Sequence, residues 1–93
     1  MSIKEKILKI MSLALEINPP EVDDIGKKRT AVFVNWSPHC NLIDGYVYYG
    51  GWDPSKSFTD YFSAATSSDD ADRHLDAIIA QLEKIKAEVE AES

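Results

Sequence analysis

The adjacent residues His39 and Cys40 come closest to a catalytic or metal-binding pair in this sequence. A reactive thiolate needs a neighbouring base or a metal, and imidazole can serve as the base or as a ligand. Adjacent side chains of an extended segment point to opposite faces, however, and only His74 adds a further histidine or cysteine. Because tetrahedral zinc needs three or four ligands, the pattern favours a turn with a half-buried thiol, and no metal or cofactor is predicted.

Paired carboxylates could act as general acid and base, and Asp44, Asp53 and Asp60 are the candidates near the middle of the chain. Turn chemistry already explains Asp44 and Asp53. The pair Gly50-Gly51 lacks the further glycines and the lysine of a phosphate-binding loop. Since no nucleophile, base and oxyanion donor converge in the pattern, the chain is predicted not to be an enzyme.

Length and composition indicate one folded domain over residues 1–93, because 44% hydrophobic residues are too many for a disordered chain. No apolar run approaches the roughly 20 residues of a membrane span, so no membrane association is predicted. Three lysines interrupt the first nine residues where a secretory signal would be apolar, and a cytoplasmic location is expected. A net charge of -6 argues against direct nucleic-acid binding, which depends on Lys and Arg.

The elements that position these residues begin and end with two helices. Ser2 and Glu5 have capping-box spacing, and an apolar three- and four-residue period predicts a helix over 3–17, ended by Asn18-Pro19-Pro20. A second helix is predicted over 69–90. Its apolar seam steps by three and four residues through Leu75, Ile78, Leu82, Ile85 and Val89.

The middle of the chain is predicted to form a sheet, because it contains all nine aromatic residues (two Trp, four Tyr and three Phe) and few charges. Strands are expected at about 30–36, 45–50 and 58–64. The turn between the first two lies either at 38–41 or at Asp44-Gly45. Segment 57–65 also fits a helical period after Asp53-Pro54, but the strand interpretation is favoured because a third strand gives two helices a platform.

The predicted architecture is therefore a single α+β domain of order α-β-β-β-α, with an antiparallel sheet and two helices packed on one face. This order is similar to that of double-stranded-RNA-binding domains at the level of topology alone. The basic residues that those domains use are missing, so no RNA-binding function is implied.

The two faces of this sheet differ in what they are expected to contact. The helix-covered face is predicted to hold Val32, Val34, Val47, Tyr49, Phe58 and Phe62, with Trp36 near its rim. The opposite face then presents Phe33, Tyr46, Tyr48 and Tyr61. Several exposed aromatics on a small protein indicate a contact surface. In the alternative interpretation, the loops at 18–29 and 52–57 partly cover these rings.

The predicted function is a non-catalytic protein-binding or oligomerisation module, self-associating through the free sheet face or the seam of the last helix. Candidate partner-binding residues are Phe33, Tyr46, Tyr48, Trp52, Tyr61, Asp72, Asp76 and Glu83. A first alternative is a small acidic inhibitor of the phage type, whose last helix imitates nucleic-acid phosphates and blocks a nucleic-acid-binding protein. A second is a small-ligand-binding domain with a closed pocket among Trp36, Trp52, Tyr49 and His39.

Overall fold

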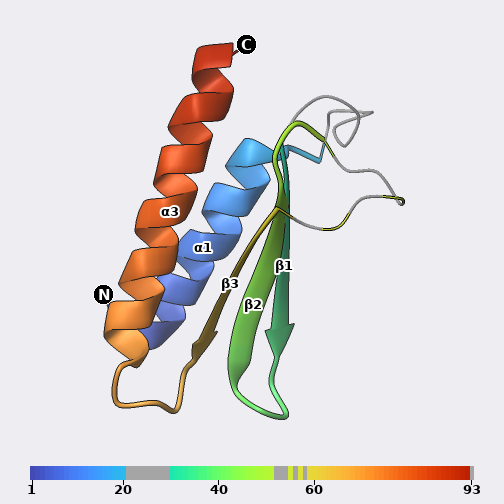
Figure 1. The fold of residues 1–93 in the computed structure, drawn as a ribbon. Helices are drawn as coiled ribbons and strands as arrows, with labels where there is room; N and C mark the ends of the chain where they lie inside the picture. Colours follow the sequence, from blue (N-terminus) through green and yellow to red (C-terminus); the bar gives the residue numbers. More distant parts are fainter. Residues whose placement is uncertain (21–29, 52–54, 56, 58, 93) are drawn as a thin grey trace.

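A helix, three strands and a second helix follow one another along the chain in the computed structural model, which describes residues 1–20, 30–51, 55, 57 and 59–92. They are α1 (Ile3–Ile17), β1 (Ala31–Ser37), β2 (Leu42–Tyr48), β3 (Asp60–Ala65) and α3 (Ala71–Glu92). The strands form an antiparallel sheet of order β1-β2-β3, and both helices lie on one side of it (Figure 1). The predicted class and element order are confirmed.

The start of α1 is held by a reciprocal cap. The Ser2 hydroxyl accepts a hydrogen bond from the Glu5 backbone N–H at 3.1 Å, and the Glu5 carboxylate accepts one from the Ser2 N–H at 2.9 Å. At the other end, Asn18 N–H donates to the Ala14 carbonyl at 2.9 Å before Pro19 stops the helix. The observed bounds coincide with the predicted helix 3–17.

The turn between β1 and β2 lies at residues 38–41. Cys40 N–H donates to the Ser37 carbonyl, Asn41 N–H donates to the Pro38 carbonyl, and Asn41 has a φ of 52°. Asparagine tolerates this left-handed conformation better than most residues. The alternative turn at Asp44-Gly45 is wrong, and the second strand spans 42–48 rather than 45–50.

Gly45 lies inside β2 because the sheet is crowded there. It pairs with Val34 on one side and with Phe62 on the other. A Cβ atom at this position would overlap the Phe33 carbonyl oxygen and the Phe62 ring. The glycine therefore permits a close approach of side chain and backbone rather than a turn.

The third strand is confirmed, and the helical interpretation of segment 57–65 is wrong. β3 pairs with β2 from Asp60 to Ala65, while Phe58, which the prediction included, lies outside the described residues. Thr66 follows the strand, and its backbone N–H and hydroxyl both donate to the Asn41 carbonyl. The hairpin turn and the end of β3 are thereby tied together.

The apolar seam of α3 is buried inside the chain. The exposed fractions are 0% for Leu75, 4% for Ile78, 0% for Leu82, 2% for Ile85 and 6% for Val89. These side chains join one core with residues of α1 and of the sheet. Self-association through this seam is therefore a wrong prediction, because α1 and the sheet already occupy it. The helix itself begins two residues later and ends two residues later than predicted.

The helix-covered face of the sheet is largely the predicted one. Val47 and Phe62 are 0% and 5% exposed, and Trp36 lies at the rim, 40% exposed. Tyr49 is the exception: it is 40% exposed, because β2 ends one residue before it. Neither helix in the described part of the chain is long and apolar enough to cross a membrane.

Candidate protein-interaction face

Three aromatic side chains form a row across the face of the sheet that the helices leave uncovered. In the strand register, Phe33 of β1 lies opposite Tyr46 of β2, and Tyr46 lies opposite Tyr61 of β3. Directly paired residues point to the same side of a sheet, so the three rings share one face. Tyr48, two residues after Tyr46, belongs to the same face. We call this surface, consisting of Phe33, Tyr46, Tyr48 and Tyr61, the aromatic face.

The rings of the aromatic face contact one another and remain accessible. Phe33 and Tyr48 meet edge-to-face with centroids 5.5 Å apart, and Tyr46 and Tyr61 lie 5.7 Å apart at a tilt of 42°. Phe33, Tyr46 and Tyr61 are 45%, 37% and 46% exposed, whereas Tyr48 is half-buried. Most of the two loops that the alternative interpretation places over these rings, residues 21–29, 52–54 and 56, lies outside the described residues.

The rest of the open face combines small polar residues with Ala31, Leu42 and Ala65 and is nearly uncharged. Asn35 donates a side-chain hydrogen bond to the Ser37 hydroxyl at 3.2 Å, and Ser63 is exposed. Among the described strand residues of this face, Asp44 is the one with a charge. Trp52, also predicted for the contact surface, lies outside the described residues.

The acidic residues predicted for partner binding lie on α3, across the sheet from the aromatic face (Figure 1). Asp72 and Asp76 each place a carboxylate oxygen 3.0 Å from the Lys6 ammonium of α1. Lys6 is only 8% exposed. Its hydrogen bonds to Asp72 and then to Asp76 raise the pKa of the ammonium above its ordinary value. These two carboxylates therefore join the helices to each other.

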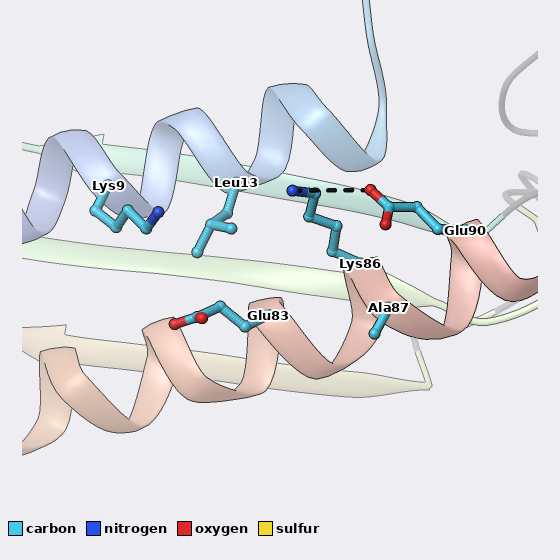
Figure 2. Close-up of a pocket in the computed structure, with 6 residues that line it drawn as sticks. All are labelled: Lys9, Leu13, Glu83, Lys86, Ala87 and Glu90. Atoms are coloured by element: carbon cyan, nitrogen blue, oxygen red, sulfur yellow. Dashed lines mark ion pairs between the residues drawn. The ribbon is translucent and has the colours of Figure 1, made fainter.

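Glu83 borders a groove of about 230 Å³ between α1 and α3, which Lys9 and Leu13 line from α1 (Figure 2). Lys86 crosses this groove to Glu16 of α1 at 3.0 Å and also approaches Glu90 at 3.7 Å. The contact with Glu16 is the main cause of the raised pKa of Lys86. Charges of both signs thus alternate along the groove, unlike the uniform negative row of nucleic-acid phosphates.

His39 and Cys40 lie in the exposed turn between β1 and β2. The Cys40 thiol is 3.8 Å from the Ser37 carbonyl and is exposed, so the prediction that it is half-buried is wrong. The turn lies at the end of the hairpin, where the side chains of residues 38–41 are all exposed. In the described part of the chain, no three His, Cys, Asp or Glu residues are grouped as metal ligands would be.

The structure does not bring together the residues predicted for a small-ligand pocket. Trp36 lines an open hollow of about 360 Å³ with residues of α1, and neither His39 nor Tyr49 belongs to it. His74 borders a separate hollow of about 340 Å³ beside β3. Trp52, the remaining predicted pocket residue, lies outside the described part.

Comparison of the chain with protein-family models, with curated proteins and with solved structures finds no match. The chemistry of the site is therefore argued from its own geometry. Phe33, Tyr46 and Tyr61 offer ring edges and faces for packing, and the tyrosines add hydroxyl groups that can donate and accept hydrogen bonds.

Proposed function

We propose that this protein is a non-catalytic module that binds a partner protein through its aromatic face. The observation that carries the proposal is the in-register row of Phe33, Tyr46 and Tyr61, each more than a third exposed on the uncovered side of the sheet. Tyrosine is enriched among the residues that dominate binding energy at protein interfaces. A small protein gains nothing in its own core from rings placed there.

The arrangement of the rings favours binding because their side chains have little conformational freedom left to lose on association. Each ring has two side-chain torsions, and the contacts of Tyr46 with Tyr61 and of Phe33 with Tyr48 already restrict them. Immobilising a flexible side chain on association costs about 0.5–1.5 kcal/mol, and rigid rings avoid part of that cost. The face is therefore organised before a partner arrives.

The charge distribution indicates what kind of partner surface fits. The chain has a net charge of -6, yet Asp44 is the one charged residue among the described strand positions of the open face. Charged residues are depleted and aromatic residues enriched in the buried centre of interfaces. The partner is expected to present a weakly charged apolar surface. Self-association through the same face stays a prediction that the experiment below also tests.

The test is capture of a partner from the native cells, comparing the wild type with the Tyr46→Ser/Tyr61→Ser variant. Losing a ring from the centre of an interface typically costs about 2 kcal/mol, so captured partner should fall at least about tenfold. The exposed helix variant Ala80→Ser/Lys84→Ser is the matched control and should capture as the wild type does. Circular dichroism checks that both variants fold.

A partner retained equally by the ring variant would contradict the proposal. So would a wild type that captures nothing and remains monomeric by light scattering. If the wild type is instead a dimer that the ring variant dissociates, the partner at this face is a second copy.

A further inference from the structure

One flank of α1 is apolar and exposed. Leu8, Met11 and Leu15 are 57%, 39% and 54% exposed, and their spacing places them on one side of the helix. Lys9 and Leu13, by contrast, line the groove against α3. The exposed apolar row is therefore turned away from α3.

This row meets the edge of the sheet at Trp36. Trp36 is 40% exposed, and with Ile7 and Leu8 it lines the open hollow of about 360 Å³. Ile3 and Lys4 border the same hollow from the first turn of α1. The helix flank and the end of β1 thus form one continuous apolar surface.

Within the described part of the chain, β1 is an edge strand whose own sequence lacks the features that usually protect an edge. The sheet order places it outermost, and its seven residues contain neither a charge nor a proline. It pairs with β2 in unbroken register, so no bulge interrupts it. An open edge of this kind is a template for another strand, which is why most exposed edges carry lysine, proline or a bulge.

The side chain of Asn18 covers one end of this edge. Its Oδ1 accepts from the Val32 N–H at 2.7 Å, and its Nδ2 donates to the Thr30 carbonyl at 3.0 Å. Alternate residues of an antiparallel strand direct their backbone groups to the same side, so Val34 and Trp36 also direct theirs outward. The described strands pair with none of these groups.

We propose that this edge is a dimer interface, at which β1 of a second copy pairs antiparallel with β1 about a two-fold axis at Asn35. Val34 of each copy then lies opposite Trp36 of the other, and their N–H and C=O groups exchange hydrogen bonds. The contact of Asn18 with Val32 stays intact in both copies. The sheet doubles in width, and the two aromatic faces become one continuous surface.

Side-chain pattern and charge favour a second copy at this edge. A strand that enters beside β1 needs apolar residues on the helix side, and β1 supplies Val34 and Trp36 there. The chain has a net charge of -6, but β1 and the residues lining the hollow include Lys4 and no carboxylate. Among the described residues of this surface, two acidic copies therefore meet without carboxylates facing one another.

The area is sufficient for a dimer of modest stability. The exposed parts of four side chains add up to about 350 Å² of apolar surface per copy. These side chains are Leu8, Met11, Leu15 and Trp36. In a dimer, the apolar surfaces of both copies and the edges of the two paired strands together bury more than about 1,000 Å². This is the smallest total area expected of a specific protein interface. We therefore expect a concentration-dependent equilibrium between monomer and dimer.

The test is light scattering of the full chain over a concentration series. The wild type should approach twice its 10.4 kDa, and Leu8→Lys/Leu15→Lys, which alters exposed helix positions, should stay monomeric with an unchanged circular dichroism spectrum. Tyr46→Ser/Tyr61→Ser is the control and should dimerise as the wild type does. In the wild type, the amides of Val34 and Trp36 should exchange more slowly with solvent as concentration rises.

Three results would overturn the edge interface. The first is a wild type that stays monomeric at millimolar concentration, and the second is a lysine variant that still dimerises. The third is a rate of amide exchange at Val34 and Trp36 that does not change with protein concentration. The aromatic face is tested separately, because the lysine variant should still capture a partner protein through it.

Discussion

Lys6 is a charged residue at a buried position of α1, and this position decides what two carboxylates of α3 do. It lies three residues after Ile3 and four before Ile10, within the apolar row that faces the core. Asp72 and Asp76 bind its ammonium, although they lie more than sixty positions away in the sequence. From the sequence alone, these two acids are candidates for binding a partner protein. A lysine inside an apolar row was the signal that an acidic partner had to be near.

The raised pKa of Lys6 predicts how stability depends on pH. Because the pKa lies above the ordinary 10.5 in the folded state, the contribution of the ammonium is complete below pH 10.5 and disappears as the pH rises through the folded-state pKa. The difference in urea midpoint between the wild type and Lys6→Met should therefore be constant near neutral pH. At higher pH the midpoint of the wild type should fall relative to that of the variant. Lys9→Met, at an exposed position of the same helix, is the control. A difference that does not change with pH would contradict the assignment.

Gly45 is the second residue whose role depends on a distant contact. Gly45→Ala should lower the free energy of unfolding by about 1–3 kcal/mol, because the added methyl group meets the Phe62 ring and the Phe33 carbonyl oxygen. Urea unfolding measures the change. Ser63→Ala, at an exposed position of the neighbouring strand, should change it by less than about 0.5 kcal/mol. Equal stability of Gly45→Ala and the wild type would show that the crowding is relieved at no cost.

At the scale of elements, α1 depends on its cap. Ser2→Ala removes the hydroxyl that accepts from the Glu5 N–H and should lower the free energy of unfolding by about 1 kcal/mol at neutral pH. Ser12→Ala, at an exposed position of the same helix, should not destabilise the protein, since alanine favours helices. Chemical denaturation followed by circular dichroism distinguishes the two. Equal effects would mean that the cap contributes nothing.

Acid should weaken the other half of the same cap. The Ser2 backbone N–H and hydroxyl lower the pKa of Glu5 below its ordinary 4.5. Because the folded-state pKa is depressed, the stabilisation from this carboxylate is present above pH 4.5 and is lost as the pH falls through the folded-state value.

The elements differ in how far the sequence predicts them. The bounds of α1 follow from Ser2, Glu5 and Pro19, whose effects are local. β2 was misplaced because an Asp-Gly pair is a common turn signal, whereas Gly45 is required by Phe62, a contact that local patterns do not show. The pattern still predicts correctly that Phe33, Tyr46, Tyr48 and Tyr61 share one face, since alternation along a strand does not depend on where the strand ends.

At the scale of the whole molecule, one side of the sheet forms the core with the helices and the other side is available to a partner. The helices bury one side of the sheet and hold half of the sixteen carboxylates of the chain. The other side presents Phe33, Tyr46 and Tyr61 with little charge. The proposed edge pairing joins these open sides from two copies. A partner protein would then meet a surface twice as wide, and binding at two sites would strengthen its attachment.

The most direct measurement of the central claim is photo-crosslinking in the native cells. A photoreactive phenylalanine analogue replaces Tyr61 on the aromatic face, and in a second protein it replaces Lys84 on the exposed side of α3. We predict a discrete covalent adduct with another polypeptide from position 61 and none from position 84. No adduct from position 61, or equal adducts from both positions, would contradict the assignment of the aromatic face as the binding surface.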